Sequence, residues 1–140
     1  MNYLLDTCVL SELVKPHPNV TVIAWLASIP PETAFISVLT IGEVRKGIEK
    51  LPMSKKKVSL TQWLTTLLED YHERILPIDL AISEAWGIIQ ATAEKAGTPM
   101  STIDGLLAAT ASVHQFVIVT RNEADFLPSH LPLLNPWHVS

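Results

Sequence analysis

Four carboxylates stand where the sequence predicts that buried strands end or helices begin: Asp6, Glu43, Asp104 and Asp125. Asp6 comes directly after the apolar run 3–5, and Asp125 comes a few residues after the apolar run 116–119. In a parallel α/β sheet, the carboxyl ends of the strands and the N-termini of the following helices meet at one crevice. Acids that are far apart in sequence can therefore share one cation. The pattern predicts a metal site for phosphate chemistry.

Each acid taken singly also has an ordinary structural explanation. Asp6, Asp104 and Asp125 could each belong to a helix N-cap, where a carboxylate accepts backbone N–H groups. Glu43 could form a solvated pair with Lys46, three residues further along the same helix. Capping tolerates Ser, Thr or Asn at most such positions and does not explain why acids recur at successive strand ends. Joint metal binding is therefore favoured for the set, while both explanations stay open for each acid.

The elements that must position these acids are strands alternating with helices. Short apolar or β-branched runs predict strands over 2–5, 33–36, 75–78, 116–120 and 131–134. Apolar residues at helical spacing predict helices over 7–14, 20–28, 38–51 and 54–74, and two more that begin after Asp79 and Ser101. This alternation predicts an α/β fold with a parallel sheet covered on both faces.

Composition bounds the class of protein. A chain of 140 residues with 48% hydrophobic content suits one domain with a real core. The single cysteine, Cys8, cannot form an intrachain disulfide, and five histidines without close spacing make a structural zinc site improbable. Neither a signal peptide nor an apolar run of about 20 residues is visible, so we expect a soluble cytoplasmic protein without membrane contact.

Several segments together resemble the PIN domain. They are Leu4-Leu5-Asp6-Thr7 with Ser11-Glu12, the runs 36–47 and 103–111, Val119-Thr120-Arg121-Asn122, and the closing Asn135-Pro136-Trp137. The resemblance covers nearly the whole chain and is strongest to VapC and FitB type toxins of toxin-antitoxin pairs. It implies a single domain over residues 1–140 with a three-layer α/β/α fold around a short parallel sheet. It also implies a metal-dependent ribonuclease toxin, usually dimeric and held inactive by a small antitoxin.

The resemblance assigns roles to the acids by position. Asp6, Glu43 and Asp104 match the three most constant acids of the family, while a fourth acid stands at the position of Asn122 in some relatives and of Asp125 in others. Mg²⁺, or alternatively Mn²⁺, takes such hard oxygen ligands and keeps several waters. The implied reaction is hydrolysis of an RNA phosphodiester by a metal-activated water, leaving a 5′-phosphate.

Neighbouring residues carry further expectations from the same resemblance. Thr7 and Thr120 match hydroxyl positions that line such sites, and Thr120 could orient a water on the metal. Cys8 departs from the pattern, because Asn commonly follows Asp-Thr in this family, and we interpret it as a small packing residue.

Basic residues predict where RNA could lie despite the net charge of -4. Arg45, Lys46 and Lys50 adjoin Glu43, and Arg121 adjoins the strand end, so these four are the expected phosphate contacts. The lysine triplet 55–57 fits RNA binding and a solvated helix end equally well. No basic DNA-binding domain is present, so DNA would be bound only through the antitoxin.

Other function classes fit less well. A phosphatase that uses an aspartyl phosphate would need a second acid two residues after Asp6, and the sequence there reads Thr7-Cys8. The stronger alternative is a catalytically inactive PIN-like protein that acts through an antitoxin in a DNA-bound complex. Apolar helical faces around Trp25 and 60–71 further predict a homodimer and a groove for the antitoxin.

Overall fold

Five short strands form one parallel sheet in the computed structural model, which describes residues 1–139. The sheet order is β3-β2-β1-β4-β5, and each neighbouring pair is parallel. The chain first adds strands on one side of β1 and then on the other, so the order reverses between β1 and β4. The strands are β1 (Tyr3–Leu5), β2 (Ala34–Ser37), β3 (Ile75–Leu76), β4 (Val117–Val119) and β5 (Leu133–Leu134).

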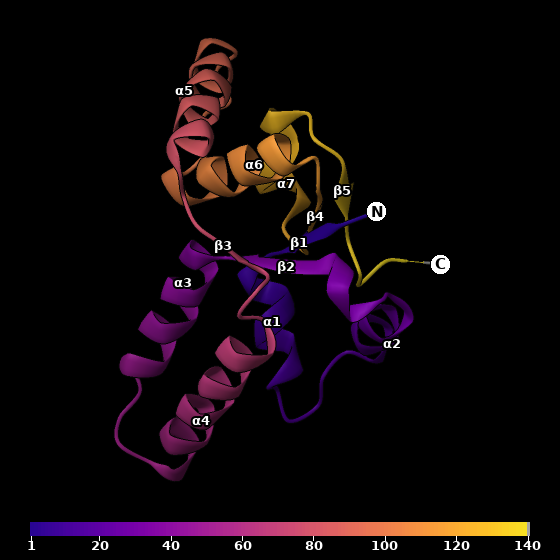
Figure 1. The fold of residues 1–140 in the computed structure, drawn as a ribbon, viewed down its shortest axis with the longest axis vertical. Helices are drawn as coiled ribbons and strands as arrows, with labels where there is room; N and C mark the ends of the chain where they lie inside the picture. The colour runs from indigo at the N-terminus through magenta and orange to yellow at the C-terminus, as the bar shows by residue number, and fades with distance from the viewer. Residues whose placement is uncertain (140) are drawn as a thin grey trace.

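Helices connect the strands and cover both faces of the sheet. In Figure 1, α5, α6 and α7 lie on one side of the sheet, and α1, α3 and α4 lie on the other. The helices are α1 (Thr7–Leu13), α2 (Val20–Ser28), α3 (Val38–Glu49), α4 (Lys55–Asp70), α5 (Leu80–Lys95), α6 (Thr102–His114) and α7 (Glu123–Phe126). The predicted three-layer α/β/α arrangement is confirmed. No helix among residues 1–139 is both long and apolar enough to cross a membrane.

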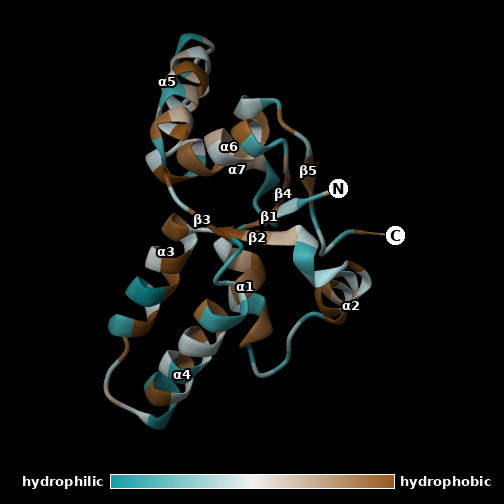
Figure 2. Cartoon of the chain, viewed as in Figure 1, coloured by the Kyte–Doolittle hydropathy of each residue, from teal (hydrophilic) through white to brown (hydrophobic). Residues whose placement is uncertain are grey.

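Two apolar cores, one on each face of the sheet, hold the layers together. Leu4 and Leu5 are both fully buried, yet they belong to different cores, because successive strand side chains point to opposite faces. Leu5 packs with residues of α1 to α4, and Leu4 packs with residues of α5 to α7. Figure 2 shows this apolar centre as brown strands between helices whose outer faces are paler or teal.

Helix ends follow the predicted capping chemistry. Ser37, Asp79 and Ser101 each accept a backbone N–H from the first turn of α3, α5 and α6 with a side-chain oxygen. Gly97 ends the turn after α5 with a positive φ of 75°, a conformation that glycine adopts without strain. These caps fix where the helices begin, and therefore where residues near their N-termini lie.

Some boundaries and surfaces differ from the sequence-based expectations. The helix expected over 54–74 ends at Asp70, and the short 3-10 turns at Pro31–Thr33 and Leu127–Ser129 were not predicted. The short helix α7 contains Asp125, for which a helix cap was considered. The faces around Trp25 and 60–71 contribute to the core within one subunit, but Trp25, Leu60 and Trp63 are only partly buried, and the homodimer stays a prediction. Large apolar side chains are exposed elsewhere: Val20, Val38, Met53, Val58, Leu80 and Ile88 are among them.

Candidate active site

Asp6 lies at the point where the strand order reverses. It follows β1 directly, is 8% exposed, and caps α1 by accepting the backbone N–H of Thr7 on Oδ1 over 2.8 Å. Its other oxygen, Oδ2, accepts the hydroxyl of Thr120, which follows β4, over 2.8 Å. Crevices at such reversals are the usual ligand sites of open α/β sheets. The cap predicted for Asp6 is real, and it orients the carboxylate at the crevice.

Thr120 has both of its hydroxyl roles filled within the protein. It is fully buried, donates to Asp6, and accepts the backbone N–H of Asn122 over 3.0 Å. A hydroxyl has one hydrogen, so Thr120 does not offer it to a water while this bond lasts. The structure therefore places Thr120 behind Asp6, as a residue that orients the carboxylate.

Thr7 joins two of the predicted acids. Its backbone N–H binds Asp6, and its hydroxyl donates to Oε1 of Glu43 over 2.6 Å. Glu43 lies in α3, 36 residues further along the chain. The solvated pair considered for Glu43 and Lys46 is absent, because the ion pair found among residues 1–139 joins Lys15 to Glu12. Thr7 therefore links Asp6 to Glu43, which is partly exposed.

Asp104 lies in the first turn of α6 and is half-buried. Partial burial raises the pKa of its carboxyl above the usual value, and the negative charges of Asp6, Asp125 and Glu43 raise it further. A hydrogen bond with the Ser101 hydroxyl opposes this rise. The charges of the three other predicted acids therefore act on Asp104 in the same direction as its burial.

The acids do not, however, form the tight cluster that the sequence predicted. Within residues 1–139, no three His, Cys, Asp or Glu side chains come close enough together to hold a metal ion as they stand. Asp6 and Glu43 are each bonded to a threonine hydroxyl instead, Asp6 to that of Thr120 and Glu43 to that of Thr7. Asp125 is also exposed, on the short helix α7.

Of the basic residues next to Glu43, two line a groove with it and one does not. Lys46 and Lys50 lie on the same face of α3 as Glu43 and line a groove of about 510 Å³ with it. Arg45 is exposed but is not part of the groove lining. Arg121 lies on the other side of Asp6, after β4, with its guanidinium carbon 5.2 Å from the ring centre of Trp137.

Comparison with known proteins decides the family. The PIN domain family matches residues 3–127. The chain belongs to the PIN domain family. The toxin FitB of Neisseria gonorrhoeae is 37% identical over 96% of this chain and 98% of its own length. The VapC ribonuclease Y4jK of Sinorhizobium fredii is 35% identical over 96% of each. A solved structure of FitAB bound to an IR36 DNA fragment gives a TM-score of 0.94 at 35% identity, over 99% of this chain and 97% of that one.

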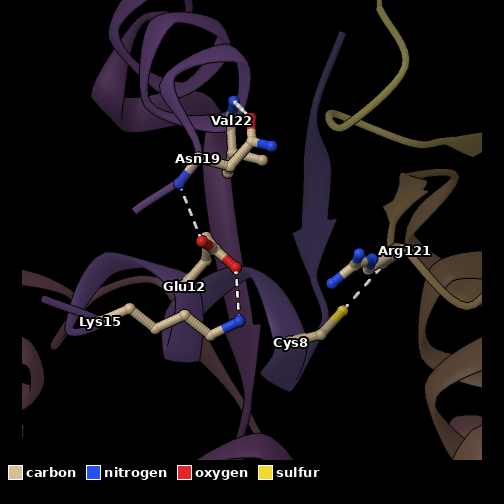
Figure 3. Close-up of polar contacts among 6 residues, drawn as sticks. All are labelled: Cys8, Glu12, Lys15, Asn19, Val22 and Arg121. Carbon is tan, nitrogen blue, oxygen red and sulfur yellow. Dashed lines mark hydrogen bonds and ion pairs between the residues drawn. The ribbon is translucent and has the colours of Figure 1, made fainter. Parts of the chain in front are cut away.

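Glu12, which the sequence analysis quoted only as part of the matching segment Ser11-Glu12, is a buried carboxylate that braces this PIN domain near the candidate site. Glu12 is 4% exposed and accepts Nζ of Lys15 over 2.9 Å and the backbone N–H of Asn19 over 2.8 Å, as Figure 3 shows. The hydrogen bond from Lys15, and to a smaller extent that from Asn19, holds the pKa of Glu12 below its usual range. Asn19 in turn caps α2. Glu12 thus fixes the loop between α1 and α2.

Cys8 packs beside Asp6, as its interpretation as a small packing residue requires. Its sulfur accepts the backbone N–H of Arg121 over 3.4 Å and lies 3.7 Å from Oδ2 of Asp6 (Figure 3 shows the first contact). Burial raises the pKa of the Cys8 thiol, and the charge of Asp6 raises it further, against the lowering effect of the Arg121 N–H. The thiol is therefore kept neutral in this PIN domain, and Cys8 lies within the intact first turn of α1.

The groove on α3 is the part of this PIN domain site that sequence reasoning missed. Its lining includes Gly42 and Gly47, and the space beyond each is open, since a Cβ added there would meet nothing within 4 Å. Two glycines inside a predicted helix weaken it and need a reason. Their position on either side of Glu43 and Lys46 was the available signal.

Proposed function

We propose that this protein is a metal-dependent endoribonuclease and the toxin of a toxin-antitoxin pair. The observation that carries the proposal is the hydrogen-bonded series Thr120, Asp6, Thr7 and Glu43 at the point where the strand order reverses, with Asp104 in the first turn of α6. The name of its relative from Sinorhizobium fredii, a VapC ribonuclease, supports the activity. The toxin name of FitB supports the biological role.

The donor set fits Mg²⁺ or Mn²⁺. Carboxylate oxygens are the ligands that these hard cations prefer, and mutual repulsion that raises the pKa of Asp104 would be relieved by a positive charge. Asp6, Glu43 and Asp104 would hold the ion, with Asp125 or Asn122 at the rim. When bound, such an ion makes a coordinated water easier to deprotonate and offsets charge that builds on the phosphate oxygens.

The residues around the acids prepare them for that role. The Thr120 hydroxyl and the Thr7 N–H each hold one oxygen of Asp6. The Thr7 hydroxyl does the same for Glu43. Such outer partners orient the ligands before a cation arrives, which lowers the cost of assembling the site. No side chain is required as a covalent nucleophile, and the ribose 2′-OH takes no part.

RNA would approach along basic residues on both sides of the acids. Lys46 and Lys50 border the groove on α3, and Arg121 lies beyond Asp6 with its guanidinium stacked near Trp137. Stacking leaves the edge of a guanidinium free to donate to a phosphate. Arg45 is a weaker contributor, because it lies outside the groove.

Assembly and location complete the proposal. Residues 1–140 form a single PIN domain that acts in the cytoplasm, forms a homodimer, and is neutralised by a cognate antitoxin. Contact with DNA occurs through the antitoxin, in line with the structure of FitAB on DNA. The dimer would use exposed apolar side chains, such as Leu80 and Ile88 of α5.

Cleavage by the purified chain separates the enzyme from the inactive binding protein. Incubation of a single-stranded RNA with added Mg²⁺ should give fragments that carry 5′-phosphates, and EDTA should stop the reaction. An Asp6→Asn protein prepared in parallel controls for contaminating nuclease. If the wild-type chain and the variant cut RNA equally, or neither cuts it, the protein is no ribonuclease and the binding role stands.

A further inference from the structure

The groove beside the acids has a composition that the hydrolysis itself does not require. Its volume of about 510 Å³ lies in the range of small-ligand sites, roughly 300–1,000 Å³. Thr7 and Glu43 line it at the end that adjoins Asp6. The remaining lining residues are apolar, glycine or lysine: Val38, Leu39, Gly42, Lys46, Gly47, Lys50 and Ile103.

Val38, Leu39 and Ile103 give the groove an apolar floor that stays open to solvent. Val38 is 41% exposed although it begins a helix beside the active site, and neither core includes it. Open apolar surface in a concave site is favourable only when a ligand covers it. Gly42 and Gly47 leave space open along α3, because they carry no side chain and nothing lies within 4 Å of where a Cβ would stand. Open apolar surface of this kind suits the face of a planar ring.

Two lysines add positive charge to the groove. Lys46 and Lys50 lie four residues apart on one face of α3, so their ammonium groups share the same side of the groove. A ligand that joins an anionic group to a flat, largely apolar ring would satisfy both features, and a nucleotide has this structure. We propose that the groove binds one unpaired nucleotide of the RNA substrate, with its base on the apolar floor and its phosphate between Lys46 and Lys50.

This inference rests on the proposed ribonuclease function and adds a base subsite to it. Because Thr7 and Glu43 belong both to the groove and to the acidic site, a nucleotide bound here lies next to the phosphodiester that is cut. The subsite would fix the register of a single strand on the acids, and a base held in a duplex could not enter it. A segment of a protein partner is the competing occupant.

The chain carries its own reporters for a binding test. It has five glycines, and glycine amides are readily resolved in a ¹⁵N–¹H correlation spectrum; Gly42 and Gly47 line the groove while Gly87 lies on α5. Nucleoside 5′-monophosphates titrated into the labelled protein should shift the amides of Gly42 and Gly47 saturably and leave Gly87 unmoved. Ribose 5-phosphate, which lacks the base, should bind roughly tenfold more weakly.

Matched variants test the base contact directly. Gly42→Leu fills the groove, and Gly87→Leu makes the same change at another helical glycine with open space beside it. Gly42→Leu should remove the preference for the nucleotide over ribose 5-phosphate, and Gly87→Leu should keep it. Unmoved Gly42 and Gly47 amides, or equal binding of the two probes to the wild type, would overturn the subsite and leave a protein segment as the occupant.

The nuclease assay on the same samples keeps the two proposals apart. Wild-type protein that cuts RNA but shows no base-dependent shift refutes the groove and leaves the ribonuclease intact. Wild-type protein that shows the shift but cuts no RNA refutes the ribonuclease, and the groove then stands as a nucleotide site of a binding protein.

Discussion

Thr120 donates its hydroxyl to Oδ2 of Asp6 over 2.8 Å, across 114 residues of sequence. The two residues follow β1 and β4, the adjacent strands at which the sheet order reverses. The same hydroxyl accepts the N–H of Asn122, so one buried atom ties a predicted metal ligand to the loop that leads to Asp125. The orientation of Asp6 therefore depends on a neutral residue.

Replacement of Thr120 by Val, which has nearly the same shape, should lower the rate of RNA cleavage by roughly 10–100-fold. The loss follows because Asp6 becomes free to turn and the Asn122 N–H is left unpaired, which also costs about 1–3 kcal/mol of stability. Cleavage rates at saturating Mg²⁺ and urea unfolding measure the two effects. Thr120→Ser keeps the hydroxyl and serves as the control; a Val variant as active as the Ser variant would show that this hydrogen bond does not matter.

Asp104→Asn should abolish cleavage and slightly stabilise the fold near pH 7. The folded state raises the pKa of Asp104 above its usual value of about 3.9, so folding disfavours the charged carboxylate. The contribution of this carboxyl to the free energy of unfolding is fully present below about pH 4. It is lost as the pH rises through the pKa of the folded state. The variant avoids that loss, and it should gain about 0.5 kcal/mol after allowance for solvent screening.

Urea unfolding in EDTA at pH 7 and at about pH 3.5 checks the direction of this effect. The gain of Asp104→Asn over the wild type should be present at the higher pH and vanish at the lower one. A variant that is less stable than the wild type at pH 7 would mean that Asp104 serves the fold, as a helix cap, more than the site.

The α/β class, the parallel sheet and most helix positions could be predicted from sequence because they depend on local signals. Apolar periodicity and caps such as Ser37 and Asp79 act within a few residues, and they fixed the starts of α3 and α5. The acids could be chosen because strand ends converge in this class of fold. The distances between the acids could not be predicted, since they depend on hydrogen bonds from Thr7 and Thr120 to residues far away in the sequence.

Which apolar faces are covered, and where a groove forms, was harder to predict, because both depend on contacts between segments that are distant in sequence. Helical spacing shows that Trp25 lies on an apolar helix face, but not whether the same subunit covers that face. Here the ring of Tyr3 packs edge-on against the ring of Trp25, with 5.1 Å between the ring centres. The groove on α3 likewise forms from α1, α3 and α6 together, and sequence shows only its two glycines, Gly42 and Gly47. Roles of individual site residues remain predictions that the experiments proposed above address.

Gly105→Ala should destabilise the protein although alanine favours helices. A Cβ at Gly105 would lie 2.9 Å from Nε1 of Trp86 and 3.1 Å from Oε1 of Gln90, so the side chains of α5 that pack on α6 would have to shift. Overpacking of this kind costs about 1–3 kcal/mol, against a helical gain of up to about 1 kcal/mol. We expect a net loss of about 1 kcal/mol in urea unfolding, and lower activity because Asp104 moves with α6.

Gly87→Ala is the matched control for that experiment. Gly87 lies inside α5 with nothing within 4 Å of its missing Cβ, so alanine there should raise stability by about 0.5–1 kcal/mol. If Gly105→Ala proves as stabilising as Gly87→Ala, the close packing of α6 on α5 does not constrain Asp104.

Neutralising Lys46 and Lys50 should weaken RNA binding and flatten its salt dependence. The slope of log K against log salt should fall by about 0.7 for each phosphate contact that is removed from a single strand. Filter binding in an Asp104→Asn background, from low to moderate salt, gives this slope without cleavage. Lys95→Ala, at the end of α5, is the control for the loss of a positive charge, and an identical slope in all three proteins would place RNA elsewhere.

Calorimetric titration of Mn²⁺ into the metal-free wild type and into Asp104→Asn tests most directly whether the acids act as one site. Asp6, Glu43 and Asp104 belong to different segments, so a shared cation is the single feature that requires all three. The wild type should bind Mn²⁺ with a measurable heat, and the variant should bind at least about tenfold more weakly. Equal affinity in the two proteins, or no binding to the wild type, would contradict the account.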